Sequence, residues 1–446
     1  MKNKFLFLLF AVFFTLNVFA QHQITGRLKP IRETRSILMY KTEGAFQYYK
    51  ASTSVDSTGM FGFILPKGFP SGNYKLIYDA QNDLAINVIY NNEDISMVFD
   101  PKDALNTIFF YNSENNSVFY DYVQTISEKY DELELIQKTY YKNKEDSTTS
   151  VKTIKKYIFK LNQIKAFQAH FEKESKGLIA KSYIQAFQKP LNKKPFETKE
   201  EKYDFLKNNY LKGINFQDTI LRNSAFLIDR LNEYVFDLNE AIAVASNTAL
   251  DTKMVSDALA LIEKSKFKDE IIYSLTSSAF DPYMSQYDQL LDFLYNNYYK
   301  QLPTESKNKK FTEMVIAKLN AIVGKKAPNI YFGGDDLYSI QSDSVLIIFW
   351  SSTCSHCLKE IPEIYKLLLE NKTTKVVLIG LEDEYSDWER VSKPFANWKN
   401  IRANGKWTNE NALNYNVKGT PAYFLLDKNK TIIAKPENLN DIKEIF

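Results

Sequence analysis

The sequence predicts a multidomain chain with an N-terminal antiparallel β-sandwich-like domain, an all-α middle domain and a C-terminal α/β domain. Residues 21–112 hold short runs rich in β-branched and aromatic residues between turn signals. Residues 113–323 are poor in glycine and repeat apolar residues at helical steps. Residues 324–446 alternate strands with helices. Hydrophobic residues make up 44% of the chain and charged residues 25%, which is typical of globular proteins with ample core.

The first twenty residues predict export. Lys2 and Lys4 precede an apolar run over residues 5–18, and a small residue follows at Ala20. A basic start, a short apolar stretch and a small residue at the cut are typical of a secretory signal peptide. We therefore expect cleavage after Ala20, localisation in the periplasm and no membrane span after cleavage, since no later stretch is long and apolar enough. The alternative is a retained N-terminal anchor.

Residues 21–112 predict a small antiparallel sandwich. Turn signals fall at residues 57–59, 67–72 and 91–92 and separate runs of strand-forming residues. No catalytic constellation occurs among these runs, so we interpret the domain as a docking or spacer domain. The predicted strands are residues 24–28, 36–40, 60–65, 74–78, 85–90 and 95–99.

Residues 113–323 predict roughly eight to ten packed helices. Val118, Tyr122, Ile126 and Tyr130, for example, recur every four residues along one helix face. Glycine, proline and polar clusters interrupt this periodicity. The breaks fall at residues 143–148, 189–195, 212–213, 281–282 and 302–303.

Both cysteines of the chain lie where a buried strand is expected to turn into a helix. Residues 345–349 form a continuous apolar run, which is typical of a strand buried on both faces. Cys357, Ile361, Ile364 and Leu368 then recur at steps of four, three and four, as one face of a helix does. Cys354 would be the exposed thiol at the tip, and the unpaired N–H groups of the first helical turn would favour its thiolate.

The spacing of these cysteines favours redox chemistry over a structural role. A disulfide between Cys354 and Cys357 would close a very short loop and add little stability. A zinc site would need two further ligands, and His22 and His170 have no partner at metal-ligand spacing.

The strand-to-helix turn resembles the active site of the thioredoxin superfamily, and more closely its TlpA-like branch of bacterial cell-envelope thiol–disulfide oxidoreductases. Glu360 and Pro362 continue that branch's C-x-x-C-x-x-E-x-P pattern. Residues 324–328 resemble its usual domain opening. Residues 419–421, Gly-Thr-Pro, resemble the family's cis-proline loop, which faces the disulfide. The resemblance covers roughly the last quarter of the chain and implies a thioredoxin-like fold there.

Four positions depart from the family pattern. Thr353 stands where many relatives have a second tryptophan, and Ile348 stands where cytosolic thioredoxins carry a buried acid. Between the cysteines lie Ser355 and His356 rather than Gly-Pro. A histidine beside the nucleophile can stabilise its thiolate and raise the reduction potential. This favours an oxidant, whereas many TlpA-like relatives are reductants, so the redox direction stays open.

The resemblance also implies roles in dithiol–disulfide exchange. Cys354 would attack the substrate disulfide and Cys357 would resolve the mixed disulfide. Glu360, with a water, would move the proton of Cys357. The alternative for Glu360 is an ordinary ion pair on the helix surface.

On the substrate side, the resemblance implies that Trp350 packs beneath the site and that His356 lies beside the nucleophile. Thr420, just before Pro421, would offer backbone groups to an extended substrate segment. No metal or organic cofactor is implied. The expected partners are protein thiols or disulfides of the cell envelope and a second envelope thiol protein that exchanges electrons with this one.

Composition gives no reason to expect a nucleic-acid partner, since 57 basic and 54 acidic side chains leave a net charge of only +3. Two other functions compete with disulfide exchange. Peroxide reduction would need Pro-x-x-x-Thr-x-x-Cys, and Ser351 rather than threonine lies three residues before Cys354. A non-enzymatic envelope binding or assembly protein could instead use the β and helical domains to contact a partner and carry the thiols as an inherited feature.

Overall fold

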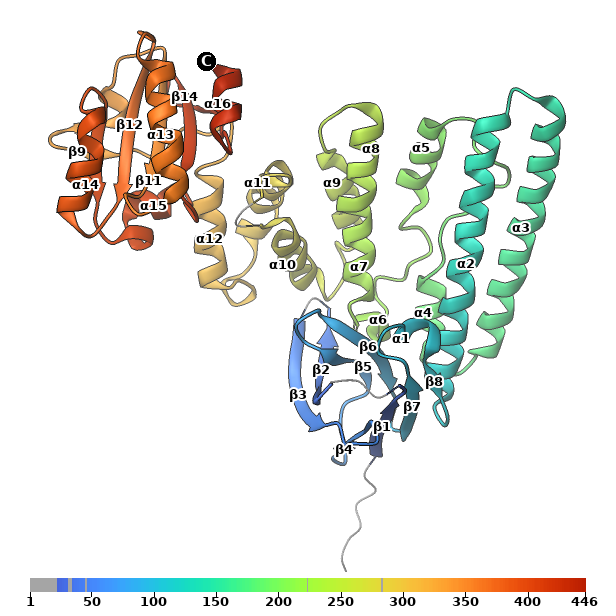
Figure 1. Ribbon diagram of the computed structural model, residues 1–446. Coiled ribbons are helices and arrows are strands. Elements are labelled where there is room, and N and C mark those ends of the chain that lie inside the picture. Colours follow the sequence, from blue (N-terminus) through green and yellow to red (C-terminus); the bar gives the residue numbers. More distant parts are fainter. Residues whose placement is uncertain (1–21, 31–33, 45, 223, 282–283) are drawn as a thin grey trace, which may run out of the picture. The chain divides into compact units, whose positions relative to one another are not determined.

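The computed structural model describes residues 22–446 except residues 31–33, 45, 223 and 282–283 (Figure 1). The predicted signal peptide lies outside these residues. The chain packs into two compact units, Met1–Ser246 and Asn247–Phe446, which are described separately below. The boundaries at residues 112 and 323 stay predictions. None of the described helices combines the length and apolarity needed to cross a bilayer.

The first unit begins with two four-stranded sheets that share one core. Ile24 and Leu28 of the first sheet and Ile37 and Met39 of the second belong to this core and are buried. The predicted sandwich-like fold is therefore confirmed, although β1 and β7 pair in parallel rather than antiparallel. The first sheet has the order β4 (Met60–Leu65), β1 (His22–Leu28), β7 (Ile95–Phe99), β8 (Phe109–Phe110). The second has the order β3 (Phe46–Ser54), β2 (Ser36–Glu43), β5 (Gly72–Asp79), β6 (Leu84–Tyr90).

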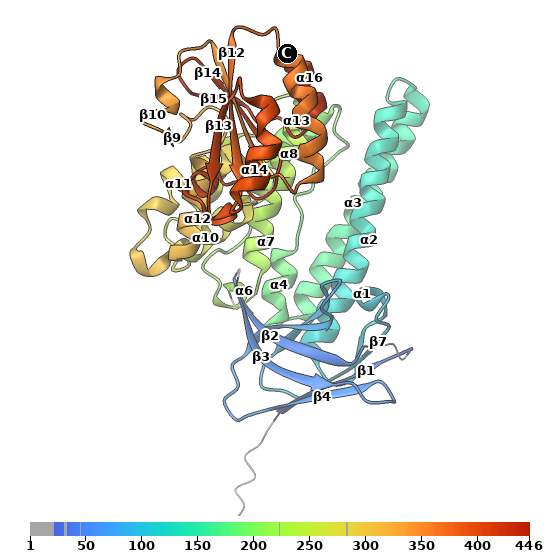
Figure 2. The same cartoon turned by 60° about the vertical axis from the view of Figure 1, so that its left-hand side comes forward.

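Helices make up the rest of the first unit. The helices α2 and α3 run side by side as a long hairpin (Figure 2). Side chains cap both: Ser113 accepts a hydrogen bond from the Asn116 N–H, and Asp146 accepts one from the Thr148 N–H. The helices are α1 (Ala104–Thr107), α2 (Glu114–Asn143), α3 (Ser147–Glu174), α4 (Ala180–Ala186), α5 (Lys199–Asn209), α6 (Thr219–Arg222), α7 (Phe226–Asn232), the π-helical η1 (Glu233–Leu238) and α8 (Asn239–Ser246).

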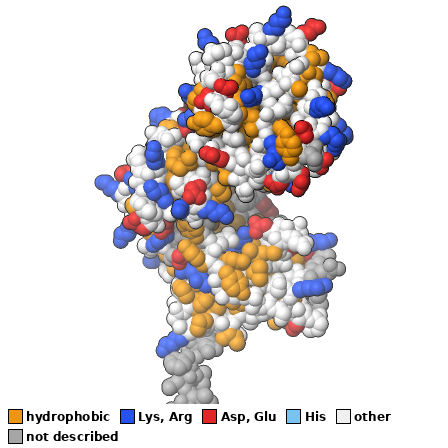
Figure 3. Space-filling model, turned by 90° about the vertical axis from the view of Figure 1, so that its left-hand side faces the viewer, with side chains coloured by type: hydrophobic (Ala, Val, Ile, Leu, Met, Phe, Trp, Pro, Cys, Tyr) orange, Lys and Arg blue, Asp and Glu red, His pale blue; other side chains and the backbone are white. Residues whose placement is uncertain are grey.

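Strand β3 was not among the predicted strands. Its residues are exposed or half-buried along its whole length, so it lacks the apolar alternation on which a strand prediction depends. It is an edge strand, and Tyr48 and Tyr49 on it are about half exposed. Hydrophobic side chains gather on one face of the β domain (Figure 3).

The second unit opens with the remaining helices of the all-α region. Eleven α-helices, α2 to α12, occupy the described part of residues 113–323, against the eight to ten predicted. Short helices such as α6 account for the difference, because four residues are too few to show a period. The helices of this region that belong to the second unit are α9 (Thr252–Leu261), α10 (Lys268–Ala279), α11 (Asp288–Asn297) and α12 (Lys309–Leu319), with the 3₁₀ turns η2 (Tyr299–Gln301) and η3 (Thr304–Ser306).

A five-stranded mixed sheet follows, with parallel strands β13, β12 and β11 and antiparallel strands β14 and β15. The order is β13 (Lys399–Ala403), β12 (Thr374–Leu381), β11 (Ser344–Trp350), β14 (Ala422–Asp427), β15 (Ile432–Ala434). Its helices are α13 (Ser355–Leu368), α14 (Tyr385–Ser392), α15 (Glu410–Asn414) and α16 (Leu439–Ile445). Smaller elements are β9 (Tyr331–Phe332), β10 (Asp335–Asp336), η4 (Leu337–Ser339), η5 (Lys393–Phe395) and η6 (Lys406–Thr408).

The sheet has a hydrophobic core on each face, as the predicted α/β fold requires. Strand β11 is buried from Val345 to Trp350. Its side chains alternate, so Ile347 and Phe349 join one core while Ile348 and Trp350 join the other. The second core also holds Cys357, because α13 lies across that face of the sheet (Figure 1). Burial of β11 on both faces thus fixes the strand that leads into the cysteine turn.

Candidate active site

Cys354 is the N-cap residue of α13. Strand β11 ends at Trp350 and α13 begins at Ser355, so a four-residue turn separates them. The backbone N–H of Cys357 donates a hydrogen bond to the Cys354 sulfur over 3.2 Å. Cys354 is partly exposed, whereas Cys357 is completely buried. The sulfur that meets solvent therefore also lies at the positive end of the helix dipole.

The two thiols differ in acidity. Burial alone would raise the pKa of Cys354, but hydrogen bonds with Cys357, Thr420 and the His356 backbone outweigh it and lower that pKa. Burial raises the pKa of Cys357, and the neighbouring Cys354 raises it further. The arrangement provides a reactive outer thiolate and an inner thiol that holds its proton.

The lowered pKa of Cys354 predicts alkylation at unusually low pH. A group with a lowered pKa keeps its charged form as the pH falls, so the thiolate persists where an ordinary cysteine is already protonated. In the reduced protein we expect the iodoacetamide reaction of Cys354 to be half-maximal below pH ~8.5, the usual thiol pKa. Mass spectrometry at each pH measures the rate. A half-maximal rate at or above that pH would contradict the prediction.

The loop at residues 419–421 lies against the outer thiol. The Thr420–Pro421 peptide bond is cis. The Cys354 thiol donates a hydrogen bond to the Thr420 carbonyl oxygen over 3.2 Å. Strand β14 starts directly after this loop, and its Ala422 pairs with Phe349 at the end of β11. Antiparallel pairing therefore brings residues 66 positions apart in sequence together at the same edge of the sheet.

Glu360 faces a buried tyrosine. The Tyr423 hydroxyl donates a hydrogen bond to Glu360 Oε2 over 2.9 Å. Tyr423 is only 2% exposed and Glu360 is half-buried. The bonded partner of this carboxylate is thus a core hydroxyl rather than a surface cation. Tyr423 was not among the predicted site residues, because nothing local in the strand marks a tyrosine that reaches the helix opposite.

A second acid, Glu382, is hydrogen-bonded to the backbone of the turn that carries the cysteines. Glu382 follows β12 directly, is 4% exposed, and its Oε1 accepts a hydrogen bond from the Ser352 backbone N–H. This residue too was missing from the predicted site. An acid at the carboxyl end of a buried parallel strand is the signal that could have found it.

Trp350 lies in the same hydrophobic core as Cys357, and Gly380 makes room for its neighbour Trp388. Trp350 is 1% exposed. A Cβ atom on Gly380 would lie 2.3 Å from Cδ1 and 2.5 Å from Nε1 of Trp388, and 3.4 Å from Nε1 of Trp350. The absence of a side chain at Gly380 therefore lets the two indoles pack over β12.

Gly380→Ala is expected to destabilise this domain by about 1–3 kcal/mol, the usual cost of overpacking. Urea unfolding followed by tryptophan fluorescence measures the change. Gly419→Ala is the matched control, because a Cβ there meets nothing within 4 Å. An unchanged unfolding midpoint in Gly380→Ala would show that the indoles move aside at no cost.

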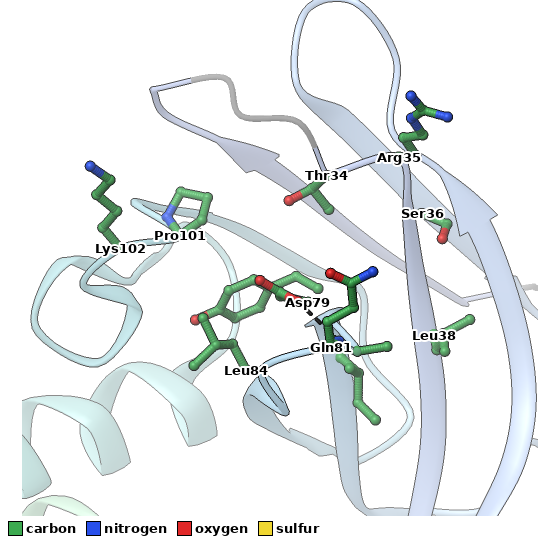
Figure 4. Close-up of a pocket in the computed structure, with 12 residues that line it drawn as sticks. Thr34, Arg35, Ser36, Leu38, Asp79, Gln81, Leu84, Pro101 and Lys102 are labelled. Atoms are coloured by element: carbon green, nitrogen blue, oxygen red, sulfur yellow. Dashed lines mark hydrogen bonds between the residues drawn. The ribbon is translucent and has the colours of Figure 1, made fainter.

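A separate cavity lies in the β domain, with a volume of about 820 Å³ (Figure 4). Asp79, an acidic residue that lines this cavity, accepts hydrogen bonds from the backbone N–H groups of Gln81 and Asn82 over 3.1 and 3.2 Å. The carboxylate thus stabilises its own turn. Among the described residues, no group of three or more His, Cys, Asp and Glu side chains is arranged so that it could hold a metal ion.

Comparisons with known proteins give a family match for the C-terminal domain. Residues 342–432 match the family model described as thioredoxin-like. No protein with a curated description matches the sequence.

Several solved structures resemble the chain. A domain of a possible thiol-disulfide isomerase from Cytophaga hutchinsonii is 32% identical, with 28% of this chain and 90% of that chain covered and a TM-score of 0.26. A thiol-disulfide oxidoreductase from Bacteroides fragilis is 23% identical, with 27% and 100% covered and a TM-score of 0.25. A thioredoxin-like protein from Bacteroides caccae is 19% identical, with 58% and 97% covered and a TM-score of 0.32.

Proposed function

We propose that this chain, whose C-terminal domain belongs to the thioredoxin-like family, exchanges a disulfide between Cys354–Cys357 and protein substrates. One observation carries the proposal. The Cys354 sulfur lies 3.2 Å from the Cys357 backbone nitrogen and 3.2 Å from the carbonyl oxygen of Thr420, which precedes the cis bond to Pro421. A partly exposed thiol at a helix N-terminus beside such a loop is suited to accept and release a substrate sulfur.

The reducing direction proceeds in two steps. The Cys354 thiolate attacks a substrate disulfide, forming a mixed disulfide while one substrate sulfur leaves as a thiolate. Cys357 then loses its proton and attacks Cys354, and the second substrate sulfur leaves. The substrate gains two electrons, and the protein pair becomes a disulfide. Run backwards, the same steps oxidise a substrate dithiol, so the geometry serves either direction.

The remaining predicted residues take supporting roles in this proposal. Glu360 receives the proton that Cys357 must lose, since a general base is needed near the buried thiol. Thr420 presents its backbone to an extended substrate segment on the exposed side of Cys354. His356 has an exposed side chain, and its backbone helps to lower the pKa of Cys354. Trp350 supports the turn from the core.

We further propose that the protein acts in the cell envelope as a TlpA-like oxidoreductase. The signal-peptide pattern of residues 1–20 and the C-x-x-C-x-x-E-x-P pattern at residues 354–362 support this. In that compartment its substrates would be exported protein thiols or disulfides. Its electrons would come from, or go to, a second thiol protein.

Insulin reduction with dithiothreitol as the electron source, and oxidation of dithiothreitol by the disulfide form, test the proposal in both directions. We expect the purified mature protein to accelerate at least one of these reactions. Acceleration of neither would overturn the enzymatic proposal. It would favour the alternative, a binding or assembly protein, for which the hydrophobic face of the β domain would be the first surface to study (Figure 3).

A further inference from the structure

A buried tyrosine, Tyr423, lies in the same core as the inner thiol, Cys357. Tyr423 on strand β14 pairs directly with Ile348 on the adjacent strand β11. Directly paired residues project to the same face of a sheet. Both side chains accordingly belong to the hydrophobic core that also contains Cys357. The core around the inner thiol thus contains an apolar residue and a neighbouring phenol.

The phenol is directed toward α13. Its hydroxyl donates to Glu360 Oε2 over 2.9 Å, joining β14 to the helix that carries both cysteines. Burial, then Glu360, then the thiolates of Cys357 and Cys354 all raise the pKa of the Tyr423 hydroxyl. The hydroxyl therefore stays protonated at neutral pH and remains a donor. Tyr423 also shares its core with Cys357, and Cys354 packs against that core.

We infer that Tyr423 is a positioning residue that holds the Glu360 carboxylate beside the proton of Cys357. The inference rests on the proposed disulfide exchange. A half-buried carboxylate would otherwise turn toward water, which solvates its charge better than the core does. The charge-assisted bond from a fixed core hydroxyl opposes that movement.

The step that Tyr423 supports is the resolution of the mixed disulfide. The Cys357 thiol gives its proton to Glu360, and its sulfur then attacks Cys354. The bond between Cys354 and the substrate sulfur breaks, and the substrate leaves as a thiolate. No electrons pass through Tyr423. Of the titratable groups, Cys354 at the cap of α13 raises the pKa of Cys357, and Tyr423 of β14 lies in the same core. Glu360 of α13 is bonded to that tyrosine, and Glu382 after β12 is bonded to the backbone of Ser352.

Tyr423→Phe removes only the hydroxyl and tests this inference. We expect resolution to slow about ten- to hundredfold, the range for loss of a hydrogen bond to a charged group. The rate is measured by stopped flow as release of the second substrate thiol from a preformed mixed disulfide, over a range of pH. Alkylation of Cys354 reports the first step and should stay unchanged.

Three comparisons make the result decisive. Glu360→Gln should slow resolution and alter its pH profile in the same way, and the double variant should be no slower than Glu360→Gln alone. Tyr415→Phe is the matched control, because Tyr415 is an equally buried tyrosine in the other core and donates to the Pro328 carbonyl oxygen over 2.6 Å. It should leave resolution unchanged.

A failure of the proposed function can be distinguished from a failure of the inference about Tyr423. A wild-type protein without exchange activity would overturn the proposed function and this inference together. An active wild type with a normal resolution rate and pH profile in Tyr423→Phe, or additive effects in the double variant, would overturn the inference alone. Should Tyr423→Phe not fold, a normal resolution rate in Glu360→Gln would overturn it.

Discussion

Cys354→Ser is expected to reduce exchange to the background of the insulin assay. Cys354 is the partly exposed sulfur, its pKa is lowered, and it caps α13. A serine hydroxyl can replace the cap, since serine is among the preferred N-cap residues, but it is a poor nucleophile toward sulfur. The fold of the domain should therefore survive while the first chemical step is lost.

Cys357→Ser is the matched variant and should fail differently. Its outer thiolate can still attack a substrate disulfide, but nothing resolves the product, so a stable mixed disulfide should accumulate and be visible by mass spectrometry. Cys354→Ser should form none. If Cys354→Ser formed the adduct and Cys357→Ser did not, the assignment of attacking and resolving thiol would be reversed.

The turn between β11 and α13 could be predicted because its signals are local. A continuous apolar run, a change to helical period and two cysteines at the junction all fall between residues 345 and 368. The structure has strand β11, helix α13 and the buried face Cys357, Ile361, Ile364 and Leu368 where these patterns indicate. Each element buries enough apolar area that no other local structure competes.

The partners that surround this turn could not be predicted in the same way. Tyr423 lies 63 residues from Glu360, and Glu382 lies 30 residues from Ser352. Their contacts depend on strand pairing, which single-sequence periodicity does not specify. The edge strand β3 was missed because all its residues are exposed or half-buried, so hydrophobic alternation, the main strand signal, is weak in it.

Trp350→Ala is expected to destabilise the C-terminal domain by about 3–5 kcal/mol, the usual cost of truncating a buried tryptophan. Trp350 is 1% exposed and lies in the core with Cys357, so the cavity would open directly under the cysteine turn. A loss of this size is a large fraction of the ~5–15 kcal/mol that stabilises a typical domain. The free energy that keeps the cysteine turn folded would fall by the same amount.

The chain itself provides the probe for that measurement. All four tryptophans, at positions 350, 388, 398 and 407, lie in the C-terminal domain, so urea unfolding followed by tryptophan fluorescence reports on this domain alone. Three indoles remain in Trp350→Ala. Trp407→Ala is the control, because that side chain is 46% exposed and its loss should change stability by no more than about 0.5 kcal/mol. Equal destabilisation by both variants would mean that burial of Trp350 does not hold the turn, and that the turn depends instead on Glu382 and the cap of α13.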